Sequence, residues 1–363
     1  MIFLDVLNFK TKHNKGNKMK TIMKTLLVSI ASLSLMLSVN AGELSVSGTA
    51  KATYNMTSGT TADQGLGVTN ELNFTASGEM DNGFTWSYSM ELDPASGGAA
   101  NNDDTKITLG MGDMGSVKIC VSECGNNKKY AADNSAYTSM TDTGFSEGIV
   151  YPGDAGASGT ATIQYHTPEL PFGTTASIAY NTQVPGDAAS GNATGATHTA
   201  QNSREEYSLV TKPIDGLTLS AQYNKVNDYD DGVTTEDQLE EGGGYAANYS
   251  AGNLSIGYGK TFQAPELLSS TATATSVEFY ENDLISIGYA INDELSVSYT
   301  RETSEANQAH SSNTTYDIEM DAVQFAYSLG GATLSVARAD YENVSYVQNA
   351  DATETIVAMS FAF

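Results

Sequence analysis

Charged side chains recur at one parity of several alternating segments in the first third of the chain. Successive side chains of a β-strand point to opposite faces, so residues of one parity share a face. Ammonium and carboxylate groups that share a face create a potential that attracts or repels mobile ions. We therefore expect ion recognition, not covalent chemistry, from this set, which comprises Lys51, Glu71, Glu79, Glu91, Lys106 and Lys118.

A second acidic set lies in a long polar segment, residues 122–157. Carboxylates at a narrow point of an aqueous path lower the barrier for cations. For any single charge, the alternative is a solvated side chain at a rim, which selects nothing. The segment contains no closely spaced Asp-x-Asp-x-Asp run, so we predict no metal site. The acidic candidates are Asp133, Asp142, Glu147 and Asp154.

The first 41 residues have the features of a targeting segment. Three lysines precede an apolar stretch from Thr25 to Val39, which is too short to span a bilayer and leads into Val-Asn-Ala. We expect residues 19–41 to be a signal peptide, cleaved after Ala41, and residues 1–18 to be upstream sequence that precedes the true start. An uncleaved membrane anchor is the alternative.

Few residues of an exported chain of this sequence suit covalent catalysis. Cys120 and Cys124 lie in the segment CVSEC, where an oxidising compartment favours a local disulfide. A nucleophilic thiol or hydroxyl needs a neighbouring base, and His166, His198 and His310 stand in no evident triad context. We therefore predict no enzymatic activity and no cofactor.

Residues 42–363 are strongly acidic. The full sequence has a formal charge of −26, and residues 1–41 hold six lysines and one acidic residue. The remainder therefore carries 11 basic and 42 acidic side chains, a formal charge of −31. Such a chain repels nucleic acid and attracts small cations, so we predict no nucleic-acid partner.

Strict alternation of apolar and polar residues runs through this part of the chain, which predicts strands. The terminal segment ETIVAMSFAF places Val357, Met359, Phe361 and Phe363 on one face. Residues 44–56 alternate in the same way and are long enough to cross hydrocarbon when tilted. We expect the apolar faces to meet lipid and the last strand to pair with the first. A tyrosine follows the apolar positions of TLSAQYN, LSIGYGK, ISIGYAI, LSVSYTR and VQFAYSL, which favours an aromatic girdle.

The links between these strands alternate in length. Eight are long and polar, beginning with TSGTTADQGLGVT and PASGGAANND, and seven are short, such as MDNG, GDMG and LGG. Loops on one side and tight turns on the other are typical of outer-membrane barrels. We predict an all-β fold, a transmembrane antiparallel β-barrel of about 16 strands with long extracellular loops and short periplasmic turns. Within residues 316–327 the apolar residues change from one parity to the other, which predicts a β-bulge.

The segment QYHTPELPFGTTASIAY, from Gln164 to Tyr180, and the terminal Phe363 resemble the Gram-negative outer-membrane general porin family. The resemblance implies a homotrimer, with the third loop, residues 122–157, folded into the lumen as a constriction. It also implies that Phe361 and Phe363 form a sorting signal for the barrel-insertion machinery, after transit with periplasmic chaperones. Residues 122–156 lack the Pro-Glu-Phe-Gly-Gly type of motif of many relatives, and no arginine cluster lies on the predicted wall.

We accordingly expect a porin of the cell outer membrane, surrounded by lipid and lipopolysaccharide. The expected function is passive diffusion of small hydrophilic solutes and ions, with cations preferred because the chain is acidic. Two alternatives stay open. One is a substrate-specific channel that binds a cationic or polyol nutrient through carboxylates of the third loop. The other is a surface β-protein that forms no channel.

Overall fold

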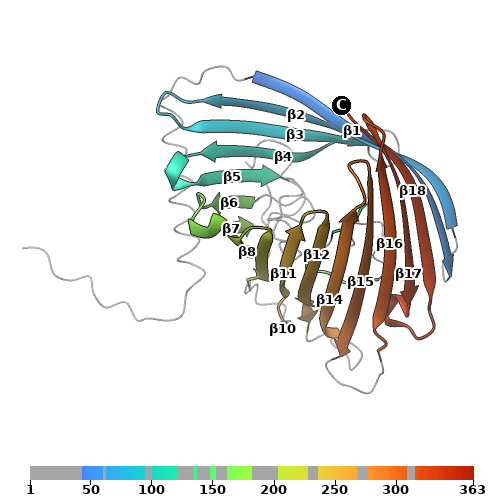
Figure 1. The fold of residues 1–363 in the computed structure, drawn as a ribbon. Helices are drawn as coiled ribbons and strands as arrows, with labels where there is room; N and C mark the ends of the chain where they lie inside the picture. The colour runs from blue at the N-terminus through green and yellow to red at the C-terminus, as the bar shows by residue number, and fades with distance from the viewer. Residues whose placement is uncertain are drawn as a thin grey trace, which may run out of the picture.

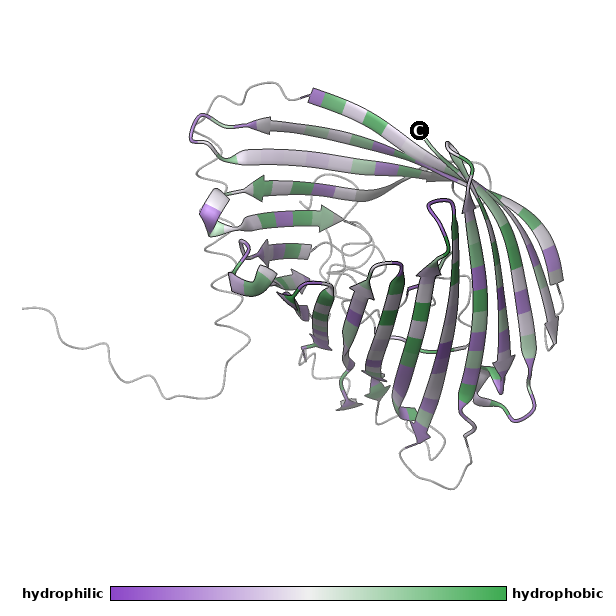
Figure 2. Ribbon diagram, viewed as in Figure 1, coloured by the Kyte–Doolittle hydropathy of each residue, from purple (hydrophilic) through white to green (hydrophobic). Residues whose placement is uncertain are grey.

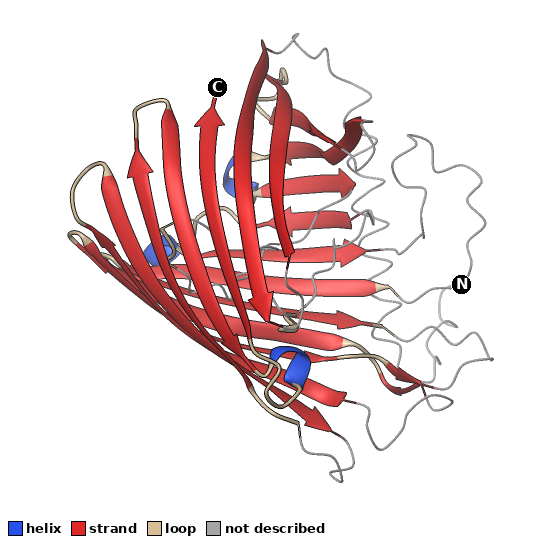
Figure 3. Cartoon of the chain, turned by 90° about the vertical axis from the view of Figure 1, so that its right-hand side faces the viewer, coloured by secondary structure: helices blue, strands red, loops and turns tan. Residues whose placement is uncertain are grey.

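The computed structural model describes residues 43–59, 63–94, 100–121, 134–136, 148–152, 162–181, 203–227, 236–268, 277–308 and 315–363. The predicted upstream segment and signal peptide, residues 1–41, lie outside these ranges. Within the ranges, no helix is long and apolar enough to cross a membrane. Helical structure there is confined to the short 3-10 turns η1 (Gly112–Met114), η2 (Pro171–Gly173) and η4 (Val344–Tyr346) (Figure 3).

Sixteen antiparallel strands close into one barrel, in which each strand pairs with its neighbours along the chain and β1 pairs with β18 (Figure 1). This confirms the predicted all-β barrel and its strand number. The barrel strands are β1 (Glu43–Gly59), β2 (Asp63–Glu79), β3 (Thr85–Pro94), β4 (Ala100–Gly110), β5 (Ser116–Val121), β6 (Thr162–His166), β7 (Thr175–Asn181), β8 (Arg204–Ile214), β9 (Leu217–Val226), β11 (Glu241–Ala251), β12 (Leu254–Ala264), β14 (Val277–Ala290), β15 (Leu295–Gln308), β16 (Ile318–Ser328), β17 (Ala332–Glu342) and β18 (Ala352–Ala362).

A small separate sheet joins two links on the loop side of the barrel. It consists of β10 (Glu236–Gln238) and β13 (Leu267–Leu268), which pair antiparallel. The Gln238 amide donates to the carbonyls of Pro265 and Glu278, at 2.7 and 2.8 Å. The link between β9 and β11 is thereby tied to the link between β12 and β14.

The barrel closes where the last residue meets the first strand. Gly48 and Phe363 exchange two backbone hydrogen bonds, of 2.7 and 3.0 Å. A Cβ on Gly48 would lie 2.7 Å from the Phe363 ring, so only glycine leaves room for the ring against β1. The predicted pairing of the last strand with the first is confirmed.

Alternating side chains divide the wall into two faces, visible as bands of opposite hydropathy along the strands (Figure 2). Large apolar side chains such as Leu66, Ile285 and Phe325 are exposed on the outer face, where lipid would cover them. The five tyrosines of the repeated segments also lie on this outer face and are partly exposed: Tyr223, Tyr258, Tyr289, Tyr299 and Tyr327.

The first two loop-side links are shorter than predicted. β1 continues to Gly59 and β2 begins at Asp63, so most of TSGTTADQGLGVT lies in strands. The hairpin keeps one register from Glu43 to Thr57, which satisfies backbone groups that a loop would leave to water. β3 likewise ends at Pro94 and β4 begins at Ala100, inside the predicted loop PASGGAANND.

The bulge predicted within residues 316–327 is also wrong. β16 pairs with β15 and β17 without a register shift. The parity slips in sequence because Ile318 and Met320 are buried toward the lumen, whereas Glu319 and Asp321 lie on the outer face near the loop side.

Candidate functional site

The third loop is the link of residues 122–161 between β5 and β6, and its two described parts, residues 134–136 and 148–152, lie against the inner wall of the barrel. Its first described part, residues 134–136, contacts β14 and β15. The Asn134 backbone N–H and side-chain amide both donate to Ser286 Oγ, at 3.0 and 2.9 Å. The Ala136 N–H donates to Ser298 Oγ at 2.8 Å. These hydroxyls replace the water that loop amides would otherwise bind.

The second described part of the loop, residues 148–152, crosses β15, β14, β12 and β11. Tyr151 donates its hydroxyl to Glu302 Oε2 at 2.6 Å. The Asn282 amide donates to the Val150 carbonyl at 2.9 Å and to Thr261 Oγ1 at 2.8 Å. Glu302 is only 1% exposed, so its carboxylate depends on such donors for stabilisation.

Two glycines of the wall make room for this loop. A Cβ on Gly288 of β14 would lie 2.7 Å from the Asn134 carbonyl oxygen. A Cβ on Gly242 of β11 would lie 3.0 Å from the Pro152 Cβ. Larger side chains at either position would displace the loop toward the open part of the lumen.

An apolar seat on the inner wall holds the loop in place. Ile149 is 6% exposed and belongs to a buried cluster on the luminal side of β11, β14 and β16–β18. Burial of an isoleucine side chain contributes about 1.5–3 kcal/mol, which offsets part of the entropy lost by the loop. The other members of this apolar seat are Ala246, Leu284, Ile318, Met320, Ala322, Ala337, Ala339, Tyr341, Val344, Ile356 and Ala358.

Five of the predicted lumen residues follow one diagonal line across β1–β5. Lys51 pairs with Thr69, two residues from Glu71, and an offset of two ladder positions relates each next member. At Lys106 the offset spans three residues of β4, from Asp103, because a bulge adds one residue there. Strand tilt and stagger are linked in a barrel, so a constant offset gives a continuous line. In order along the wall, the members of this charged line are Lys51, Glu71, Glu91, Lys106 and Lys118.

The charged line therefore differs from the purely positive strip that the lysines alone would form. Lys106 and Lys118 lie on adjacent strands, whereas two glutamates separate them from Lys51. Glu71 accepts a hydrogen bond from Thr49 Oγ1 at 3.2 Å. Glu79, the remaining wall candidate, lies exposed at the end of β2.

The other predicted site residues are placed only in part. Asp133, Asp142, Glu147, Asp154 and Cys124 lie outside the described residues. Cys120 ends the luminal side of β5 and is disulfide-bonded. Among the described side chains, no group of three or more histidine, cysteine or acidic residues is placed to hold a metal ion.

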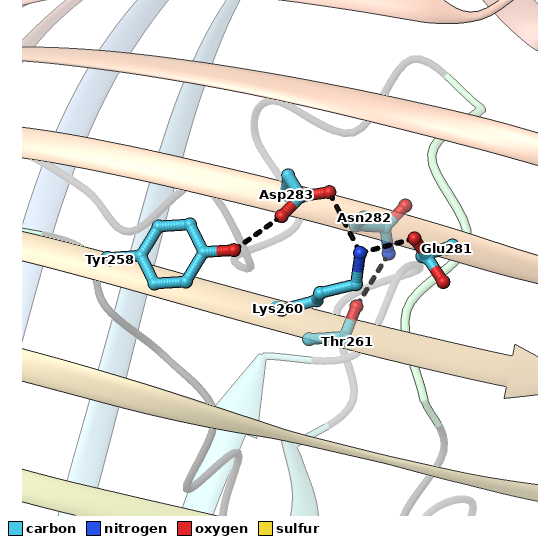
Figure 4. Close-up of polar contacts among 6 residues, drawn as sticks. All are labelled: Tyr258, Lys260, Thr261, Glu281, Asn282 and Asp283. Atoms are coloured by element: carbon cyan, nitrogen blue, oxygen red, sulfur yellow. Dashed lines mark hydrogen bonds and ion pairs between the residues drawn. The ribbon is translucent and has the colours of Figure 1, made fainter.

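The outer face near the loop side carries a polar network that parity alone assigned to lipid. Lys260 pairs with Glu281 and Asp283, and Asp283 accepts the Tyr258 hydroxyl at 2.7 Å (Figure 4). Asn282, between the two acids in sequence, turns inward to Thr261. Arg301 and Arg338, which also lie on the outer face, pair with Glu319 and Asp340.

Sequence reasoning missed the residues that anchor the third loop. Asn282, Ser286 and Glu302 have the inward parity of polar residues on any strand, so nothing local distinguished them. The only available signal was apolar residues at inward positions, such as Ile318 and Met320, which demand a buried partner.

Comparisons with known proteins identify the family to which this barrel is similar. The sequence model of a family described as Gram-negative porin matches residues 26–363. OmpF of Salmonella typhi, solved with daunomycin, is 15% identical, with a TM-score of 0.63 over 89% of this chain and 98% of that chain. An anion-selective porin from Comamonas acidovorans is 14% identical, with a TM-score of 0.62 over 89% and 100%. OmpT of Vibrio cholerae, in trimer form, is 12% identical, with a TM-score of 0.62 over the same shares. A comparison with curated proteins finds no match.

Proposed function

Because the chain belongs to the Gram-negative porin family, we propose that it forms a water-filled outer-membrane channel for passive diffusion of small hydrophilic solutes and ions, with cations preferred. The observation that carries this proposal is the position of the third loop. The described parts of the loop hydrogen-bond to β11, β14 and β15, and the charged line lies on β1–β5. Strands β3 and β12 are eight places apart in the closed order of sixteen, so the two features face each other across the lumen.

The proposed cation preference rests on the summed charge. A formal charge of −31 over residues 42–363 lowers the potential in and above the lumen for every cation. Three lysines against two glutamates on the charged line oppose this field locally. A similar barrel in Comamonas acidovorans is anion-selective, so the fold itself does not determine the sign of the preference.

The reversal potential of single channels under a salt gradient tests both parts of the proposal. Purified protein in a planar bilayer should give stepwise, ohmic openings and a cation-directed reversal potential. An anion-directed potential would keep the channel but refute the cation preference, and would assign selectivity to Lys51, Lys106 and Lys118. Absence of channels from protein with an intact barrel would refute the function.

We further propose that the protein is a homotrimer whose contact face includes the outer side of β1–β3. Among the described residues, the outward positions of these three strands carry no charged side chain, whereas those of β12–β17 carry the paired charges. An uncharged wall suits another protein surface, and a charged rim suits lipopolysaccharide headgroups. A particle mass equal to that of one protomer, measured by light scattering in mild detergent, would refute the trimer.

Export by the segment 19–41 and sorting by Phe361 and Phe363 complete the proposal. Insertion by the barrel-assembly machinery, with periplasmic chaperones in transit, follows from this route. The amino terminus of protein isolated from outer membranes should be Gly42. Any other terminus would contradict cleavage after Ala41.

A further inference from the structure

The last loop-side link contains an unusual concentration of left-handed backbone. Four of the five non-glycine residues with positive φ among the described residues fall in the segment Asn343–Asn349. They are Asn343, Ser345, Tyr346 and Asn349, with φ between 56° and 61°. Such conformations are unfavourable for residues with a Cβ and persist where surrounding contacts fix them.

Local contacts fix the ends of this segment, which we call the clamp turn. The Asn343 amide donates to the Asp317 carbonyl at 3.0 Å, and the Asn349 N–H donates to Asn343 Oδ1 at 3.1 Å. The Val344 N–H donates to the Ala350 carbonyl at 2.7 Å. None of these bonds explains why Ser345 and Tyr346, in the middle, hold the same strained conformation.

The middle of the clamp turn contacts the third loop. Gly148 has a φ of 92°, and a Cβ there would lie 2.8 Å from Ser345 Oγ. Tyr346 shares a hydrogen bond of 2.8 Å with Ser304 Oγ on β15, and its ring packs against the buried cluster that contains Ile149. Tyr346 thus ties the wall and the third loop together.

An apolar contact strengthens the same junction. Val344 is 7% exposed and belongs to the apolar seat that buries Ile149. The third loop at residues 148–151 is therefore enclosed between the inner wall on one side and the clamp turn on the other.

We propose that the clamp turn positions the third loop and thereby sets the width of the constriction, with Tyr346 and Ser345 as positioning residues. The inference deepens the channel function and rests on it. The strained backbone is maintained because it brings Ser345 and Tyr346 onto residues 148–150. Loss of the contact frees the loop to move into the open lumen, where it reduces the current intermittently.

The test compares Tyr346→Phe with Tyr327→Phe, both in the refolded full-length chain. Tyr346→Phe removes the shared hydroxyl and keeps the ring, whereas Tyr327 is exposed on the outer face. Loss of one hydrogen bond should raise the time spent in sub-conductance states about fivefold in Tyr346→Phe only. Ser304→Ala should have a similar effect, and the double variant should show no further increase because both changes remove one bond.

A second measurement does not depend on conduction. Hydrogen exchange of the backbone amides at residues 148–151 should be about fivefold faster in Tyr346→Phe than in the wild type, and unchanged in Tyr327→Phe. Unaltered exchange and unaltered sub-states, in a barrel that keeps its heat-modifiable mobility, would overturn the proposal. If the wild type forms no channels but exchange is faster in Tyr346→Phe, the channel function is refuted and the positioning role of the clamp turn stands.

Discussion

Truncation of Ile149 measures how firmly the apolar seat holds the third loop. Ile149 is 6% exposed among buried side chains of the inner wall. Isoleucine-to-alanine changes in cores cost ~2–5 kcal/mol, and the low end applies here because the loop can settle into the space. A loss of ~2 kcal/mol raises the undocked fraction of the loop about 30-fold, since 1.4 kcal/mol is tenfold. The barrel itself should be unaffected because its strands pair independently of this side chain.

Limited proteolysis of folded protein in detergent reports that fraction. Cleavage within residues 122–161 of Ile149→Ala should be about 30-fold faster than in the wild type, because the rate tracks the open population when reclosing is fast. Ile285→Ala is the matched control, since Ile285 is 50% exposed on the outer wall. Equal cleavage rates in the wild type and Ile149→Ala would refute the reasoning that apolar burial docks the loop.

Three further changes test other contacts. Gly48→Val should displace the Phe363 ring from β1 and lower the free energy of unfolding by about 1–3 kcal/mol. The temperature at which the barrel unfolds in SDS should therefore fall. Gly65→Val is the control, because a Cβ at Gly65 would contact nothing within 4 Å. Gly288→Val should displace the third loop at Asn134 and reduce single-channel conductance, and an unchanged conductance would contradict this wall contact. Burial raises the pKa of Tyr346 from 10.0 to about 12, so the docked form holds this proton more tightly than a free tyrosine does. Docking of the third loop should not change with pH near neutrality and should weaken between pH 10 and about 12. An increase in sub-conductance states near neutral pH would contradict this prediction.

The barrel was predictable because strand periodicity and link length are local properties. Alternation along ETIVAMSFAF identifies a lipid-facing strand without reference to any other segment. The pairing of the last strand with the first was also predictable, since closure of the barrel requires the two to meet.

The seat of the third loop was not predictable in the same way. Ile318 and Met320 look like lipid-facing residues until Glu319 and Asp321 are known to lie at the loop side, where charge is tolerated on the outer face. The parity rule assumes water inside and hydrocarbon outside along the whole strand. Here protein occupies part of the inside and the polar rim occupies part of the outside, so the rule fails at one end of the strand.

The members of the charged line were predictable, but their alignment along one diagonal was not. Parity identified all five members, yet only the register shows that they lie on one diagonal. A two-residue slip at one strand pair would have broken the diagonal and changed the local field. Register depends on bulges such as the one between Ser89 and Glu91, which leave little trace in composition.

The seat of the third loop also dictates an order of assembly. The described hydrogen bonds that hold the loop join it to residues 114 to 162 positions later in the chain. During synthesis and export the loop therefore exists well before anything it can dock on. Tyr151 cannot dock before β15 is in place, and the side chains that bury Ile149 extend to β18, so both residues must wait until the later strands have paired. Docking of the third loop is consequently completed late. If the loop narrows the lumen as proposed, a barrel released before that step would form a wider and less selective channel.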